Sequence, residues 1–290
     1  MPELPEVETV RRGLEHYAVG RRVTAVVIIG ARTVRRQEAA ALVAALTGRR
    51  LAAARRFGKY LVVPLDDGPL DGAVNSGGAP GEALVIHLRM SGQLLRVTPD
   101  QPMSAHTHAR LLLDDGTEIR FVDARTFGEL FVASDLDAAG RPAALAALGP
   151  DPLIDGVDVE RLQRLAASRR TTLKAFLLDQ AVLAGIGNLY ADEICFAARL
   201  RPTRPVAALR PIEWGRLATA IRAVLEAAVG ARGSTLRDAR YVDLLGDAGS
   251  YQDHHAVYGR SGEPCPRCGR AVCRTRVAGR SAHFCPGCQR

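Results

Sequence analysis

The sequence predicts an α+β fold with an N-terminal domain of antiparallel strands, a helical middle domain and a cysteine-rich C-terminal segment. Short strand-like runs follow a single helix within residues 1–134. Alanine- and leucine-rich helical patterns fill residues 135–235, and five of the six cysteines lie within residues 236–290. At about 100–200 residues per domain, a chain of 290 residues accommodates roughly two domains of ordinary size.

The N-terminal part combines one helix with several strands. Apolar residues at helical spacing predict a helix over residues 6–19 that ends at Gly20. An Asp-Asp-Gly sequence at 114–116 predicts a tight hairpin turn, and residues 66–82, rich in glycine and proline, predict a mobile surface loop. Short apolar runs predict strands over 22–29, 60–65, 83–88, 93–97, 109–113, 117–122 and 129–133. Strands at this spacing are typical of a sandwich or a barrel.

The middle part is predicted to be helical. Two glycines, Gly185 and Gly187, separate the second helical pattern from the third, which predicts two helices joined by tight turns. The helical patterns cover 158–167, 171–180, 188–199 and 211–229.

The C-terminal cysteines form two CxxC pairs with sixteen residues between them. Each pair brings two thiolates to one side of a tight turn, and two pairs complete a closed tetrahedral site, which predicts one structural Zn²⁺. Two disulfides are the alternative, disfavoured in an intracellular protein. Cys273 and His283 are competing ligands, but they break the paired symmetry. The predicted ligands are Cys265, Cys268, Cys285 and Cys288.

Composition and charge limit the possible functions. With 47% hydrophobic and 24% charged residues, the chain is not disordered as a whole. No apolar run approaches the ~18–20 residues of a membrane helix, and the acidic start MPELPEVETV lacks a signal-peptide pattern, so we expect a cytoplasmic protein. The net charge of +8 favours a polyanionic partner, although a basic surface alone gives the same balance.

The basic residues are almost all arginine. Of 39 basic side chains only Lys59 and Lys174 are lysine, which indicates either chance or positions that require a lysine, because only lysine readily loses its proton. Four arginines lie between the CxxC pairs, where they form either a phosphate-binding surface or a solvated basic face. They are Arg270, Arg274, Arg276 and Arg280.

The N-terminus carries a candidate nucleophile. Removal of Met1 is expected before a proline, and it exposes the secondary amine of Pro2. An α-amino group has a pKa of about 7.7–8, so a larger fraction is neutral at pH 7 than for lysine, with a pKa near ~10.4. Glu3 is adjacent and is a candidate acid or base. Alternatively, Glu3 and Glu6 only stabilise the start of a helix.

Five motifs resemble those of the formamidopyrimidine-DNA glycosylases, bacterial enzymes that remove oxidised purines. The resemblance extends along nearly the whole chain. The motifs are PELPEVETV at 2–10, HLRMSG at 87–92, DARTFG at 123–128, GIGNLYA at 185–191 and VYGRSGEPC at 257–265.

The resemblance implies a β-sandwich, a helix–two-turn–helix DNA-binding domain and a bifunctional glycosylase and AP lyase. It assigns the nucleophile to Pro2, which forms a Schiff base with C1′, and the proton-donating acid to Glu3. Lys59 corresponds to the lysine of β-elimination. Arg280 corresponds to the finger arginine of δ-elimination, and clamping a phosphate suits its permanent charge better than donating a proton.

The resemblance also implies DNA contacts. Met90, Arg125 and Phe127 correspond to the wedge that fills the gap left by an extruded nucleotide, whereas core packing is the alternative for Met90 and Phe127. Phosphate contacts correspond to His106, Arg169, Asn188 and Arg280. Lys174 corresponds to a family lysine that begins the helix before the turn and is counted among the DNA-binding residues.

The sequence departs from the family pattern at four places, one of which is the loop at 66–82, longer than is typical of the family. Arg169 stands where relatives often have lysine, and Thr126 where some have a second arginine. Residues 233–251, which correspond to the loop over the extruded base, differ most.

The implied partner is damaged double-stranded DNA, bound by a monomer without membrane association. Two other functions stay open. An endonuclease VIII-like enzyme acts on oxidised pyrimidines and shares the fold, but its N-terminus usually departs from LPEVETV. A non-catalytic zinc-ribbon DNA-binding protein would form no covalent intermediate.

Overall fold

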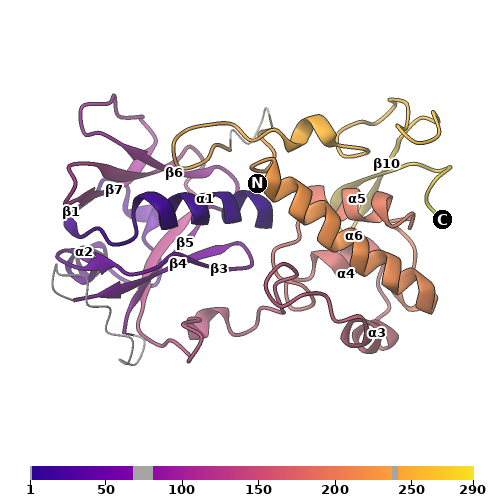
Figure 1. Cartoon of the computed structure of the whole chain (residues 1–290), viewed down its shortest axis with the longest axis horizontal. Coiled ribbons are helices and arrows are strands. Elements are labelled where there is room, and N and C mark those ends of the chain that lie inside the picture. Colours follow the sequence, from indigo (N-terminus) through magenta and orange to yellow (C-terminus); the bar gives the residue numbers. More distant parts are fainter. Residues whose placement is uncertain (1, 68–80, 237–240) are drawn as a thin grey trace. The chain divides into compact units, whose positions relative to one another are not determined.

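The computed structural model describes residues 2–67, 81–236 and 241–290 (Figure 1). The described chain divides into two compact units. Unit 1 comprises Pro2, residues 6–146 and residues 234–249. Unit 2 comprises residues 3–5, 147–233 and 250–290. Most of the predicted helical part and the five C-terminal cysteines therefore share unit 2, whereas residues 135–146, 234–236 and 241–249 belong to unit 1. The predicted loop at 66–82 falls mostly outside the described residues.

Unit 1 is a sandwich of two antiparallel sheets, as the sequence predicted. One sheet has the strand order β1-β7-β8-β6, and the other has the order β2-β4-β5-β9, with β3 paired to β4. The strands are β1 (Val23–Ile28), β2 (Arg50–Leu51), β3 (Arg55–Phe57), β4 (Tyr60–Asp66), β5 (Ala83–His87), β6 (Gly92–Val97), β7 (Thr107–Leu113), β8 (Glu118–Asp123) and β9 (Glu129–Ala133).

One hydrophobic core lies between the two sheets. In β7, buried residues alternate with half-buried ones, the pattern of a strand with one face on a core. Leu111 from this strand and Ile86 from β5, in the other sheet, belong to the same buried cluster. Helix α1 (Leu4–Tyr17) adds Val10 and Leu14 to this cluster. The core fixes the strand ends from which the candidate site loops emerge.

Three elements of unit 1 were not predicted. Helix α2 (Ala39–Leu46) is an apolar run without a polar face, so its sequence lacks helical periodicity. Strands β2 and β3 are two and three residues long, too short to show a pattern. Pairing with β4 creates both strands.

Unit 2 contains helices followed by the β10–β11 hairpin. Asp158 and Thr172 accept hydrogen bonds from backbone N–H groups at the starts of α3 and α4, as N-cap residues do. The elements are α3 (Val159–Ala167), α4 (Leu173–Leu178), α5 (Asn188–Ala197), α6 (Pro211–Gly230), β10 (Cys273–Val277) and β11 (Arg280–Phe284). Short 3₁₀ turns lie at 31–33, 143–145, 206–208 and 251–254. Within the described ranges, no helix has both the length and the apolar character needed to cross a bilayer.

Candidate active site

The four cysteines of the two CxxC pairs converge in unit 2. Their sulfur atoms all lie within 4.8 Å of one another. Neighbouring sulfurs are 3.4 Å (Cys268–Cys285) and 3.9 Å (Cys265–Cys288) apart. A tetrahedral Zn²⁺ with Zn–S bonds near 2.3 Å places its sulfurs about 3.8 Å apart, whereas a disulfide needs about 2.05 Å. The cluster therefore fits one structural Zn²⁺.

The two competing ligands lie outside this cluster. Cys273 Sγ faces the carbonyl of Ala271 at 3.9 Å, and His283 Nδ1 faces Asp192 Oδ2 at 3.1 Å. Because all four positions of a tetrahedral site are filled by cysteine, the zinc has no open position and serves the fold.

Glu3 is buried against the N-terminus of α5. Only 3% of the residue is exposed. Its Oε1 accepts a hydrogen bond from the Leu189 amide (2.9 Å), and its Oε2 accepts one from the Tyr190 amide (3.3 Å). A helix N-terminus offers unpaired N–H groups and a partial positive charge, so it holds an anion in a fixed place. The carboxylate is thereby fixed in orientation.

The glycine-rich turn before α5 is shaped by this carboxylate. A Cβ atom at Gly187 would lie 2.3 Å from Glu3 Cδ, so no other residue fits without displacing Glu3. Gly185 has φ +98°, and the Leu4 amide donates to its carbonyl at 3.0 Å. Gln180 closes the turn by accepting from the Gly185 amide and donating to the Ile186 carbonyl. The GIGN turn therefore makes room for the Glu3 side chain and accepts a hydrogen bond from the Leu4 amide.

Pro2 and Lys59, the predicted nucleophile and β-elimination lysine, are both buried in unit 1. Pro2 lies just before α1. Lys59 occupies the two-residue turn between β3 and β4, where Gly58 has φ +59°. Arg56 supports this turn, because it donates to the Gly58 carbonyl and forms a buried ion pair with Glu8 of α1.

Glu8 is one of the charged residues that hold this turn. Burial alone would raise its pKa, but hydrogen bonds from Arg11 and Arg56 and their charges hold the pKa below its usual value. Glu8 is therefore ionised at neutral pH, and its charge keeps Arg56 against the turn that carries Lys59.

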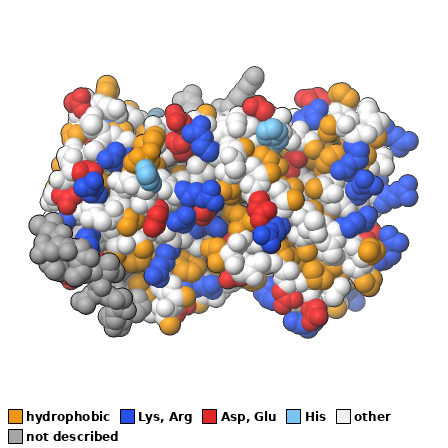
Figure 2. All heavy atoms as spheres, viewed as in Figure 1, with side chains coloured by type: hydrophobic (Ala, Val, Ile, Leu, Met, Phe, Trp, Pro, Cys, Tyr) orange, Lys and Arg blue, Asp and Glu red, His pale blue; other side chains and the backbone are white. Residues whose placement is uncertain are grey.

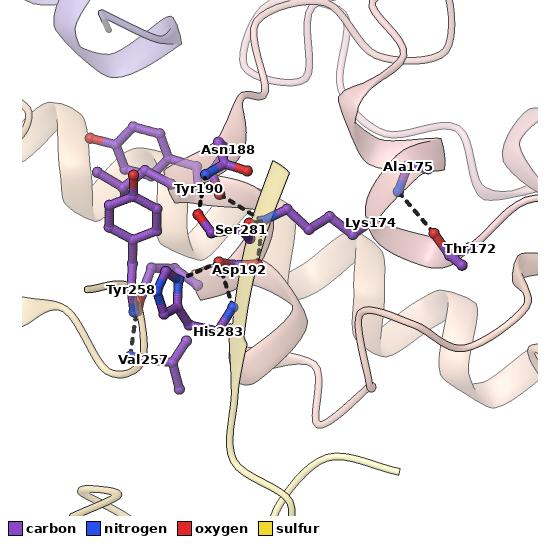
Figure 3. A network of polar contacts seen from close by, with 12 residues as sticks. Thr172, Lys174, Ala175, Asn188, Tyr190, Asp192, Val257, Tyr258, Ser281 and His283 are labelled. Atoms are coloured by element: carbon purple, nitrogen blue, oxygen red, sulfur yellow. Dashed lines mark hydrogen bonds and ion pairs between the residues drawn. The ribbon is translucent and has the colours of Figure 1, made fainter. Parts of the chain in front are cut away.

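Lys174 is fully buried in unit 2 and has three acceptors within the protein (Figure 3). Its Nζ donates to Asp192 Oδ1 (2.7 Å), to the Ser281 carbonyl (2.5 Å) and to the Asn188 carbonyl (3.3 Å). An ammonium group has three N–H donors, so all of them are engaged. In this position Lys174 ties α4, α5 and β11 together, and its three donors are all used within the protein.

The same network includes Asn188 and Ser281, the neighbour of Arg280. Asn188 Nδ2 lies 3.3 Å from Ser281 Oγ, and Asn188 Oδ1 is buried without a partner in the described structure. Rotating the amide by 180° lets the Ser281 hydroxyl donate to Oδ1 and places Nδ2 at the buried position. Arg280 is exposed beside Ser281, after a two-residue turn in which Ala278 (φ +48°) and Gly279 (φ +76°) are left-handed. Arg280 therefore presents its guanidinium donors at the surface of unit 2.

Sequence reasoning missed two buried carboxylates of α5. Asp192 Oδ2 accepts from the His283 amide at 2.9 Å, and Asp192 also pairs with Lys174. Glu193 accepts from the amides of residues 256, 257 and 258. Burial raises the pKa of Glu193, although these hydrogen bonds oppose the rise. Two adjacent acids in an otherwise apolar helix are the sequence signal that indicates them.

The predicted wedge residues lie on two loops of unit 1, and all three are exposed: Met90 (38%), Phe127 (49%) and Arg125, whose guanidinium lies 5.1 Å from the Phe127 ring centre. Exposure of Met90 and Phe127 disagrees with the core-packing alternative. His87 supports the first loop: burial and the charges of Arg89 and Lys59 lower its pKa to about 3, and its Nδ1 accepts from the Arg89 amide at 2.8 Å.

The remaining predicted phosphate contacts lie in different units. His106 is exposed on a loop of unit 1, where its amide bonds to Ser104 Oγ. Arg169 is half-buried between α3 and α4 of unit 2, pairs with Asp179 at 2.5 Å and lies over the Phe176 ring.

Arginines also gather where α6 begins beside the zinc centre, at the right of Figure 2. They line a pocket of about 640 Å³ together with Glu213 and two zinc-binding cysteines. Hydrogen bonds from Arg204, against the effect of burial, lower the pKa of Glu213 to about 2, so this carboxylate is ionised at neutral pH. The arginines that line the pocket are Arg199, Arg210, Arg216, Arg267 and Arg290.

Three family models match the chain. Residues 1–130 match the formamidopyrimidine-DNA glycosylase N-terminal domain, residues 148–240 match the H2TH domain of the same enzymes, and residues 262–290 match the zinc finger found in FPG and IleRS. Formamidopyrimidine-DNA glycosylases of Parafrankia sp. and Nocardia farcinica are 45% and 43% identical. Each alignment covers all of this chain and 98% of the relative.

Solved structures agree with the family models. Fpg (MutM) of Lactococcus lactis, in complex with DNA containing N7-benzyl-Fapy-dG, has a TM-score of 0.87 and 32% identity, with 99% of both chains covered. MutM (Fpg) of Thermus thermophilus has a TM-score of 0.83 and 41% identity, covering 99% of this chain and 98% of that one. The chain therefore belongs to the formamidopyrimidine-DNA glycosylase family.

Proposed function

We propose that the protein is a base-excision repair enzyme, a bifunctional DNA glycosylase and AP lyase that removes 8-oxoguanine and formamidopyrimidines from duplex DNA. The observation that carries the proposal is the Glu3 carboxylate, which directly follows the candidate nucleophile and is held by two N–H groups of α5. Membership of the family supports the glycosylase activity.

The first step is assigned to Pro2 and Glu3. After removal of Met1, the Pro2 nitrogen attacks C1′ of the damaged nucleotide, and the bond between C1′ and the base breaks as the base leaves. The nitrogen loses its proton, and the ring oxygen of the sugar gains one when the ring opens to the Schiff base. Glu3 transfers this proton, because its carboxylate is adjacent in the chain and fixed in orientation.

Strand cleavage is assigned to Lys59 and Arg280. The Schiff base acidifies the C2′ proton, which Lys59 removes as the 3′ phosphate leaves. Loss of a further sugar proton then expels the 5′ phosphate. Arg280 stabilises a flanking phosphate through its fixed charge, and its exposed position on the finger hairpin supports this role.

DNA binding is assigned to exposed residues of both units. Met90, Arg125 and Phe127 insert where the damaged nucleotide has left the helix, and His106 contacts phosphate. Asn188 and Arg169 contribute further donors, and Lys174 acts through Asn188. Fpg of Lactococcus lactis, 31% identical, has been solved with abasic-site DNA, which supports damaged duplex DNA as the partner. We propose that the protein works as a monomer in the cytoplasm.

Borohydride trapping tests the proposal. With a duplex that contains 8-oxoguanine opposite cytosine, we expect a covalent adduct whose peptide begins at Pro2 by mass spectrometry. A form that retains Met1 is expected to give none. Glycosylase activity with no trapped adduct would exclude the proposed Schiff base.

Two parallel substrates separate the alternatives. An oxidised pyrimidine in the same sequence context is expected to be cut more slowly than 8-oxoguanine. The reverse order would favour an endonuclease VIII-like enzyme. DNA binding with no cleavage of either substrate would favour a non-catalytic zinc-ribbon protein.

A further inference from the structure

Asp123, the last residue of β8, is a fully buried carboxylate in unit 1. Within the described part of the chain, no cation forms an ion pair with it. Burial of a charge without a counter-charge is unfavourable unless hydrogen bonds replace its water. Three donors do so. Ser91 Oγ and the Arg125 amide donate to Oδ1 at 2.5 and 3.1 Å, and the Gly128 amide donates to Oδ2 at 2.7 Å.

These donors belong to the two loops that carry the predicted wedge. Ser91 directly follows Met90, whereas the Arg125 and Gly128 amides lie on either side of Phe127. The two oxygens of one carboxylate therefore connect a loop after β5 with the loop after β8.

The backbone of Asp123 reaches a third loop. Its amide donates to the His106 carbonyl at 2.9 Å, and its carbonyl oxygen lies 2.8 Å from His108 Nε2. His106 is the predicted phosphate contact of unit 1. Each predicted DNA contact of unit 1 is therefore either hydrogen-bonded to Asp123 itself or next in the chain to a residue that is.

Both wedge loops hold strained residues that need such support. Arg89 has φ +53° and Thr126 has φ +54°, which are left-handed conformations disfavoured for residues with a side chain. Arg89 precedes Met90, and Thr126 lies between Arg125 and Phe127. There is also no space for the second loop to shift inward, because a Cβ at Gly128 would lie 2.4 Å from Phe121 Cζ. The carboxylate keeps each strained turn in place.

We propose that Asp123 is a positioning residue that holds Met90, Arg125, Phe127 and His106 in a single geometry for extrusion of the damaged nucleotide. The inference rests on the proposed function, since it assumes that the wedge residues occupy the space that the damaged nucleotide leaves in the duplex. It assigns Asp123 no contact with DNA. Its effect is confined to steps in which a base leaves a double helix.

The Asp123→Asn variant tests this role with little change in volume. An amide offers one oxygen, so its NH₂ group must face either the Gly128 amide or the donors from Ser91 and Arg125, and one set of bonds is lost. Ser91→Ala removes one bond to the Met90 loop and serves as the milder variant. Asp115→Asn is the control for loss of a carboxylate of unit 1 away from these loops, because Asp115 accepts from the Thr117 amide and pairs with Arg21 and Arg96.

Three measurements separate positioning from general damage. Single-turnover excision of 8-oxoguanine from duplex DNA is expected to fall roughly 10- to 100-fold in Asp123→Asn, since a misplacement near 1 Å has effects of this size. In Ser91→Ala the excision rate at saturating DNA is expected to fall several-fold. The fluorescence rise of 2-aminopurine next to the lesion, which reports unstacking, is expected to slow in proportion. A single-stranded abasic oligonucleotide has no double helix in which an extruded nucleotide leaves a gap. Its cleavage rate is therefore expected to stay within about twofold of the wild-type rate.

The outcomes also separate the two proposals. If the wild-type protein neither excises 8-oxoguanine nor cleaves abasic DNA, the proposed function is wrong. If the wild type is active but both variants excise at the Asp115→Asn rate, Asp123 does not position the wedge. Equal losses on duplex and single-stranded substrates in both variants would likewise overturn the inference, because they indicate general damage to unit 1.

Discussion

Replacing Lys174 with methionine is expected to destabilise unit 2 by about 3–5 kcal/mol. Both partners of the Lys174–Asp192 ion pair are completely buried, and removal of one partner leaves an uncompensated charge in the interior. Methionine preserves most of the side-chain volume, so the loss of charge and hydrogen bonds accounts for the cost. The second change, Asp192→Asn, removes the orphaned charge. The double variant is therefore expected to be more stable than Lys174→Met alone.

The single tryptophan provides the assay. Trp214 is buried in unit 2 and packs edge-on against Phe176 of α4, the helix that carries Lys174. Urea unfolding of the zinc-loaded protein, followed by tryptophan fluorescence, therefore reports on the relevant unit. A cost below about 1 kcal/mol for Lys174→Met, or no recovery in the double variant, would refute the reasoning from burial.

Salt dependence distinguishes a buried positioning lysine from one that contacts DNA. Each phosphate contact contributes about 0.9 to the slope of log affinity against log salt concentration. Lys174→Met is expected to leave this slope unchanged, whereas Arg280→Gln, at an exposed position, is expected to lower it by about 0.9. A reduced slope in Lys174→Met would mean that the side chain leaves its buried position when DNA binds.

Three further variants test other parts of the site. Glu3→Gln keeps one acceptor oxygen for the α5 amides, loses the other and cannot transfer a proton, so borohydride trapping is expected to slow at least ~10²-fold in protein that is still folded; a wild-type rate would exclude the acid–base role. Cys268→Ser is expected to release the zinc and weaken DNA binding, and one full equivalent of zinc in a dye-based assay would contradict the Cys₄ site. Between pH 6.5 and about 3, His87 is neutral in the folded wild type and protonated in the unfolded chain. The free energy of unfolding therefore falls by about 1.4 kcal/mol for each pH unit below 6.5 within this range. His87→Asn is expected to flatten the fall of the urea midpoint from pH 7 to 4.5, and parallel profiles would show that His87 is not responsible.

Much of the fold was predictable because it follows from local patterns. A short apolar run at 109–113 placed most of β7, and the glycine pair before α5 marked the turn that receives Glu3. The CxxC spacing identified the zinc ligands, since two such pairs can close around one ion. By contrast, α2 has no periodicity, and β2 and β3 exist only because β4 pairs with them.

The sequence by itself determined the residue types and their spacing: a proline followed by an acid at the start, two CxxC pairs at the end, and the motifs that carry the family resemblance. Only the tertiary structure decided which polar groups are buried and what they bind. Lys174 shows the difference, because one lysine in an arginine-rich chain suits a phosphate contact as well as a buried ion pair. Its partners lie 18 and 107 residues away in the chain, at Asp192 and Ser281. Contacts over such separations leave no local pattern, because folding, and not spacing along the chain, brings their atoms together.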